Sequence, residues 1–134
     1  LSFVFRYLFM LKRFGSFLVL SVFVSSLANA QSVKLTSVQI SEILNGNTAS
    51  GIWGGEVYHQ YFGVDGITTI IKAGDLKKIG KWKINDDTEE FLSRFPGDID
   101  WQSWYIMEYS GDYYWVSKTT PPTKFKLEIG NKLK

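Results

Sequence analysis

Apolar and polar residues alternate with a period of two along most of this 134-residue chain after residue 46. This period is typical of β-strands that turn one face toward a core. Short sequences rich in Gly, Asp, Asn and Pro interrupt the pattern and mark turns. The pattern predicts strands at residues 47–53, 56–62, 67–72, 79–84, 88–95 and 124–129. Residues 88–95 also fit a helical turn, and we interpret them as a strand because their neighbours indicate a meander.

The same alternation predicts which side chains share a face. In residues 79–84 the lysines alternate with Trp82 and Ile84, so we expect the lysines outside and the apolar residues inside. The inward set expected in the fourth and last strands is Gly80, Trp82, Ile84, Phe125, Leu127 and Ile129. One face of residues 56–62 carries Tyr58, Gln60 and Phe62, and the other carries Val57, His59 and Tyr61.

Residues 101–117, WQSWYIMEYSGDYYWVS, have the pattern of an aromatic β-hairpin. We favour a two-residue Gly111-Asp112 turn, because glycine then takes the first central position of a type II′ turn. A three-residue turn would move Trp115 to the other face. The favoured turn places three aromatic residues around one carboxylate: Trp104, Tyr113 and Trp115 around Glu108. We expect the opposite, purely apolar face to be core: Tyr105, Met107, Tyr109, Tyr114 and Val116.

A short helix is predicted before the strands. Thr36 is a good N-cap, and Gln39 completes a capping box with it. Leu35 and Ile40 are spaced for a hydrophobic staple across that cap, and Gly46 ends the helix. A helix of about three turns is marginal alone, so it must lie on an apolar partner. We expect it to cover a barrel mouth or one face of the sheet.

These elements predict a mainly β fold, in which one short N-terminal helix precedes a 7–8 stranded antiparallel meander. Closure into a small barrel would remove the exposed strand edges. A half-open sheet or a sandwich is the alternative.

The first thirty residues have the pattern of a secretory signal peptide. Lys12 and Arg13 precede an apolar run at residues 14–24, and Ala28-Asn29-Ala30 matches the small-residue cleavage pattern. Cleavage before Gln31 would leave residues 31–134 as a single β-barrel domain. The apolar run is about half of the ~20 residues that span a bilayer, which favours cleavage over a stable membrane anchor. Met10 is an alternative start, in which case residues 1–9 lie upstream of it.

Removing this leader changes the charge. The formal charge of the whole chain is +2, and the leader takes away Arg6, Lys12 and Arg13. The remaining 12 basic and 13 acidic residues give a formal charge of −1, with no positive excess to favour nucleic acid. No cysteine is present, so neither a disulfide nor a lipoprotein anchor can form. We expect a soluble bacterial protein that is periplasmic or secreted.

Little in the sequence predicts an enzyme. His59 is the single histidine, which leaves a catalytic triad or a multi-histidine zinc site without partners. We expect a half-buried strand residue bonded to a hydroxyl or carboxylate. The acidic cluster at residues 86–90 lacks the spacing of a calcium loop, and Glu56 and Glu108 are most simply solvated. We therefore expect no catalytic residue, no metal and no cofactor.

Several short motifs, in order, resemble a known family. They are residues 44–51 (LNGNTASG), 61–66 (YFGVDG), 80–86 (GKWKIND) and 111–114 (GDYY). In this order they are similar to a family of small exported proteobacterial proteins catalogued as a domain of unknown function, over residues 35–116. The resemblance implies a small lipocalin-like β-barrel in the envelope and no particular activity. The family's cysteine pair would fall near Leu92 and Trp104, so any disulfide of the family is absent here.

The aromatic hairpin is the strongest functional feature. Aromatic side chains stack on sugar rings, line apolar pockets or anchor protein interfaces. The candidate ligand-binding residues are Trp101, Trp104, Glu108, Tyr113 and Trp115. Our leading hypothesis is a non-enzymatic exported module that binds a small apolar or amphipathic molecule. The alternatives are an envelope protein–protein or hydrolase-inhibitor module and an enzyme of unknown type.

Overall fold

Strands dominate the part of the chain that the structure describes, residues 31–74 and 76–133 of a computed structural model. A two-residue strand and one helix precede eight further strands. The elements are β1 (Val33–Lys34), α2 (Ser37–Leu44), β2 (Thr48–Trp53), β3 (Glu56–Phe62), β4 (Ile67–Lys72), β5 (Lys78–Asn85), β6 (Glu90–Arg94), β7 (Gln102–Tyr109), β8 (Asp112–Val116) and β9 (Thr123–Glu128). The predicted order of helix and strands is confirmed, including the strand within residues 88–95.

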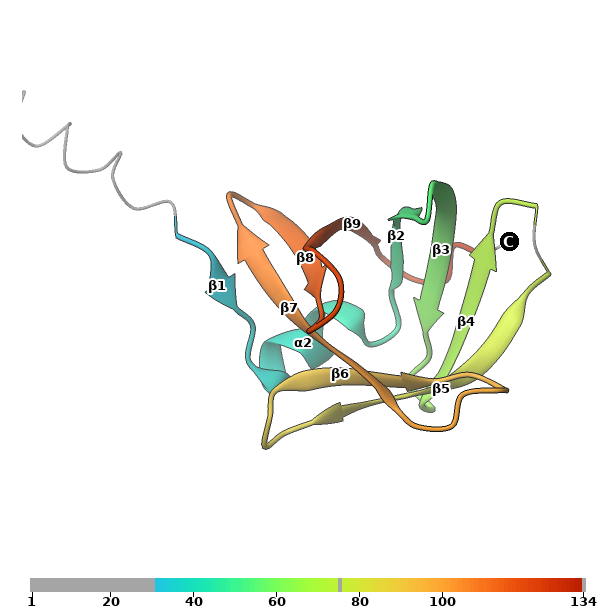
Figure 1. Ribbon diagram of the computed structural model, residues 1–134, viewed down its shortest axis with the longest axis horizontal. Coiled ribbons are helices and arrows are strands. Elements are labelled where there is room, and N and C mark those ends of the chain that lie inside the picture. The colour runs from blue at the N-terminus through green and yellow to red at the C-terminus, as the bar shows by residue number, and fades with distance from the viewer. Residues whose placement is uncertain (1–30, 75, 134) are drawn as a thin grey trace, which may run out of the picture. The chain divides into compact units, whose positions relative to one another are not determined.

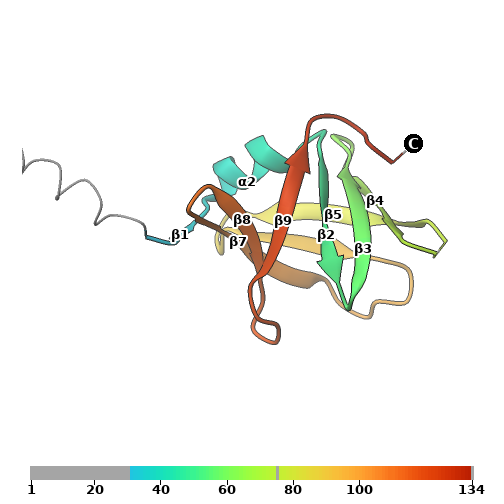
Figure 2. The same ribbon diagram turned by 90° about the horizontal axis from the view of Figure 1, so that it is seen from above.

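The strands β2 to β9 close into an eight-stranded antiparallel barrel (Figures 1 and 2). Each strand pairs with the next one along the chain, and β9 pairs back onto β2. The fold is therefore a small lipocalin-like barrel, as predicted. Strand β6 covers only the first half of β7, and β1 pairs with Met107 and Glu108 in the second half. The N-terminal strand thus shields an edge that closure alone leaves open.

The side-chain alternation is as predicted in most strands. Tyr58 and Phe62 point into the barrel from β3, Trp82 from β5 and Phe125 from β9, and all four are buried. Ile129 is an exception, because β9 ends at Glu128 and the Ile129 side chain is 87% exposed. The expectation that Ile129 points inward was wrong, since the alternation stops with the strand.

The helix α2 closes one end of the barrel (Figure 2). Thr36 caps it, with the Gln39 N–H donating to Thr36 Oγ1 and the Thr36 N–H donating to Gln39 Oε1, so the capping box is confirmed. Ile40 and Leu44 are completely buried, and α2 contacts β5 and β6. Of the described helices, none is long and apolar enough to cross a membrane.

The segment Gly80-Lys81-Trp82 shows why these residue types are needed there. A Cβ atom on Gly80 would lie 2.6 Å from the Arg94 carbonyl oxygen and 2.7 Å from the Phe95 ring. Two residues on, the Trp82 indole N–H donates to the Gly63 carbonyl at 2.8 Å. Glycine permits close approach of β6, and tryptophan fills the interior.

The turn of the aromatic hairpin differs from the prediction. Tyr109 pairs with Asp112, so the two turn residues are Ser110 and Gly111 rather than Gly111 and Asp112. Both have positive φ, 51° and 84°, which is the pattern of a type I′ turn. The register differs from the predicted one by two residues, and a shift of two keeps every side chain on its face. Trp104 and Trp115 therefore share a face, as expected.

The interior position of Trp82 gives a stability prediction. Trp82→Ala removes a buried ring and its hydrogen bond, and should lower the free energy of unfolding by ~3–5 kcal/mol. Lys81→Ala, at an exposed neighbouring position, should change it by less than ~0.5 kcal/mol. Chemical denaturation monitored by circular dichroism measures both. Equal midpoints would show that the faces of β5 are assigned wrongly. Lys83 is a poorer control because its ammonium lies 4.2 Å from the Trp101 ring centroid.

Candidate functional site

The two ends of the barrel differ. The helix α2 leads directly into β2, so β2 starts at the helix end and runs away from it. Antiparallel pairing then places four connections at the opposite end, which we call the open end: residues 54–55, 73–77 apart from residue 75, 95–101 and 117–122. The helix end holds most of the buried apolar cluster. The open end has space for a site.

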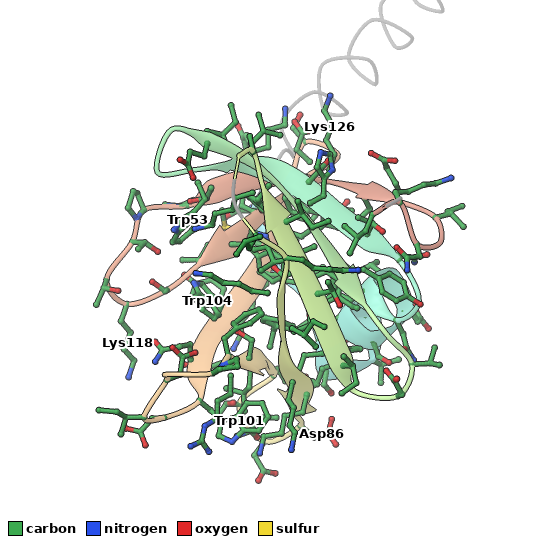
Figure 3. All side chains as sticks on the ribbon, turned by 90° about the vertical axis from the view of Figure 1, so that its right-hand side faces the viewer. Trp53, Asp86, Trp101, Trp104, Lys118 and Lys126 are labelled. Atoms are coloured by element: carbon green, nitrogen blue, oxygen red, sulfur yellow. The ribbon has the colours of Figure 1, made fainter. Side chains whose placement is uncertain are left out.

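A cavity of about 180 Å³ runs into the barrel from the open end. Its described lining is mainly aromatic: Trp53, Tyr58, Gln60, Ile70, Lys72, Phe91, Ser93, Phe95, Trp104 and Trp115. Phe91 and Trp115 also belong to the buried cluster and form the floor. Figure 3 shows Trp53 and Trp104 together at the cavity, with Trp101 apart from them, below in this view.

Three polar side chains of the lining are buried. The Tyr58 hydroxyl accepts a hydrogen bond from Trp115 Nε1 at 3.0 Å, which leaves its own proton to donate. Gln60 Nε2 donates to Thr68 Oγ1, which in turn donates to the Tyr61 carbonyl, so the amide orientation is fixed. Among the described residues, neither Gln60 Oε1 nor the Ser93 hydroxyl bonds to another side chain. These groups are available to a ligand or to water.

Burial raises the pKa of Tyr58 above its ordinary value of about 10, while the Trp115 hydrogen bond opposes this in part. The phenol therefore stays neutral throughout the physiological range. A neutral phenol keeps the proton that it can donate into the cavity.

The structure brings together two of the five predicted site residues. Trp104 and Trp115 line the cavity, while Tyr113 stacks on Phe125 deeper in the barrel, 5.8 Å between ring centroids. Glu108 is exposed near the helix end of β7, and Trp101 lies outside the barrel against Lys83. Neither lines the cavity.

The faces of the hairpin are reversed relative to our expectation. The Trp104 face points into the barrel, where Ile106 is completely buried and Trp115 is 6% exposed. The face expected as core is mostly outside, with Tyr109 45% exposed, although Val116 is buried. The reason is that Ile106, which has no polar atom in its side chain, must be inside, whereas tyrosine hydroxyls can remain in water on the outer face.

Sequence reasoning missed most of the lining. Tyr58, Gln60 and Ser93 stand at inward positions of regular strands, where a filled core would carry apolar residues. Polar residues at inward strand positions are the signal that could have located the cavity.

His59 lies on the outer face of β3 in a shallow groove with Ser50, Ile52 and Lys126. Its Nδ1 is buried and has no hydrogen-bond partner among the described residues, contrary to our expectation of a hydroxyl or carboxylate partner. The described lining of the groove contains no carboxylate. Within residues 31–74 and 76–133, no three His, Asp or Glu side chains gather as a metal site would require.

Comparisons with protein families, with curated proteins and with solved structures found no match to this chain.

The corrected hairpin faces predict an order of stabilities. Trp115→Ala should cost ~3–5 kcal/mol of unfolding free energy, because its ring stacks on Phe125 at 4.4 Å and contacts Phe91 at 5.1 Å. Tyr114→Ala, on the outer face, should cost about 1 kcal/mol or less. This order reverses the one expected from the hairpin sequence. Denaturant titration of both variants measures it, and a larger loss for Tyr114→Ala would refute the assigned faces.

The buried phenol predicts an alkaline instability. The pKa of Tyr58 is higher in the fold than in the unfolded chain, so its contribution is present below about pH 10 and is lost as the pH rises above that value. The free energy of unfolding of Tyr58→Phe should therefore fall less steeply between pH 9 and 11 than that of the wild type. The difference between the two slopes should be below about 1.4 kcal/mol per pH unit, the limit for one titrating group. Tyr109→Phe, at an exposed tyrosine, is the control and should keep the wild-type slope. Identical slopes for wild type and Tyr58→Phe would contradict the assignment.

Proposed function

We propose that this chain is an exported, non-enzymatic binding module that holds a small apolar or amphipathic molecule in the open end of its barrel. The observation that carries the proposal is the aromatic cavity, which runs into the barrel and ends on the buried cluster. A pocket inside the barrel favours ligand binding over the alternative of a filled barrel with an aromatic surface for a protein partner.

The size of the cavity limits the ligand. An apolar cavity of roughly 150 Å³ in another protein binds benzene, and pockets for drug-sized molecules begin near roughly 300 Å³. A volume of about 180 Å³ therefore suits a molecule of one or two rings. The aromatic walls supply apolar contact, and the buried hydroxyls and amide supply orientation.

The chemistry of the lining supports holding a molecule rather than converting it. The lining residues carry rings, an amide, two hydroxyls and one lysine, with no histidine or carboxylate among the described residues that line the cavity. Export is the other half of the proposal. Export rests on the signal peptide predicted at residues 1–30, which lies outside the described residues. The predicted periplasmic or secreted location depends on the same signal peptide. The family resemblance is likewise a prediction from the short motifs.

One observation favours a second candidate, an interaction with another envelope protein. Ile52 and Val57 are direct neighbours on β2 and β3, and they are 61% and 48% exposed on the outer surface. Two adjacent exposed apolar side chains are a small patch compared with known interfaces. This candidate therefore ranks second.

The proposal is tested by native mass spectrometry of the protein purified from its host, together with two tryptophan variants. The wild type should retain a small molecule. Trp104→Ala removes a cavity wall and should weaken retention by at least about tenfold, whereas Trp101→Ala, which lies outside the cavity, should not change it. Equal retention by the two variants would place the site elsewhere. A protein copurifying in place of a small molecule would favour the second candidate.

A further inference from the structure

One charged residue, Lys72, belongs to the described lining of the cavity. Lys72 ends β4 and follows Thr68 and Ile70 on the inward face of that strand. Among the ten described residues of the lining it is the only one charged at neutral pH. It pairs directly across the β3–β4 ladder with Tyr58.

An inward-facing lysine is unusual at this position, because an ammonium near apolar walls loses water of hydration. That loss costs free energy unless an anion or hydrogen-bond acceptors take the place of the water. The simplest alternative is that the lysine stem covers the rings and the ammonium reaches water. A bound anion would satisfy the same ammonium and also use the donors beside it. The Tyr58 proton and the Ser93 hydroxyl are both available for donation.

The remaining charges of the barrel do not oppose an anion at this end. Acidic residues concentrate toward the helix end, in the connections and strand ends there: Asp65, Asp86, Asp87, Glu89, Glu90 and Glu128. At the open end, Lys77, Lys78, Arg94 and Lys118 accompany Lys72. Glu56, Asp98 and Asp100 also lie at this end, so the described residues there carry no negative excess. A small anion is therefore not repelled from the entrance.

From these observations we infer that the ligand is a small aromatic acid, with one or two rings between the aromatic walls and a single carboxylate beside Lys72. This inference rests on the proposed function. A neutral aromatic molecule would leave the ammonium with water alone, and an aromatic amine would meet a like charge. An aromatic acid differs from a general apolar ligand because its affinity for the barrel depends on the charge of Lys72.

The test compares two probes that differ in charge and little in shape, phenylacetate and phenylacetamide. Each is titrated into the extensively dialysed protein and followed by two-dimensional NMR, with the indole N–H of Trp104 as the reporter. Wild type should bind phenylacetate at least about tenfold more tightly than phenylacetamide, as expected for a charge-assisted contact. Lys72→Met should weaken phenylacetate binding by about tenfold and change phenylacetamide binding by less than about twofold.

Two variants control this result. Lys118→Met removes an open-end lysine that points away from the cavity (Figure 3) and should leave both affinities unchanged. Lys72→Arg keeps the positive charge and should keep the preference for the acid. If Lys72→Met does not fold, the wild-type preference and Lys72→Arg still decide the question.

The possible failures are distinguishable. Equal affinities for the two probes, both reported by Trp104, would overturn the inference that the ligand is an acid. The proposed binding function would still stand. If neither probe binds, the molecule retained in native mass spectrometry decides: an aromatic acid supports the inference, and a neutral or cationic molecule overturns it. No probe binding and no retained molecule would overturn the inference together with the proposed function.

Discussion

Phe91 contacts four other aromatic rings inside the barrel, and the rest of the interior depends on these contacts. Its ring centroid lies 5.4 Å from that of Phe62, 6.1 Å from Trp82, 6.2 Å from Trp104 and 5.1 Å from Trp115. These residues come from five different strands, so one cluster links β3, β5, β6, β7 and β8 across the barrel. Aromatic pairs at such distances add to the stabilisation from burial. This cluster also separates the filled helix end of the barrel from the cavity at the open end.

The hollow end departs from what a stable core would contain. Gln60 and Ser93 are almost completely buried at inward positions, and burying polar groups costs free energy unless hydrogen bonds compensate. One side of the Gln60 amide is compensated through Thr68. The other side and the Ser93 hydroxyl face the cavity. Departures from core rules that persist in an otherwise consistent fold are typical of functional sites.

The sequence predicted the fold better than the site, for a physical reason. Alternation along a strand defines two faces, and in β5 the face of Trp82 is the more apolar one. The sequence therefore predicted correctly that Trp82 points inward. In the aromatic hairpin both faces carry large apolar groups, and alternation alone does not say which is inside. Closure of the barrel makes that choice, through contacts with strands far away in sequence, such as that of Trp115 with Tyr58 of β3. The turn lies one residue earlier than predicted, because Ser110 adopts a positive φ, which the prediction assigned to glycine alone.

Trp101 and Glu108, two of the three predicted site residues that do not line the cavity, lie to either side of the part of β7 that lines it. Trp101 precedes the first residue of β7, so its side chain follows the loop and reaches Lys83 outside. Glu108 keeps the parity of Trp104 but stands near the far end of the same strand, where it is exposed. Conversely, nothing in the sequence around Lys72 distinguishes it from a surface lysine. Only the position of β4 in the closed barrel places Lys72 at the cavity.

If the cavity holds a ligand as proposed, folding and binding share residues at its floor and separate toward its rim. Phe91 and Trp115 belong both to the buried cluster and to the cavity lining, so changing either would alter stability and, under the proposed function, ligand affinity together. Lys72 lines the cavity without belonging to that cluster, and Trp104 is only partly buried against it. Because the helix end is filled and capped by α2, the fold can tolerate change at the rim more readily than at the floor. Under the proposed function, the open end of this barrel is therefore the part in which ligand specificity can vary while the architecture stays the same.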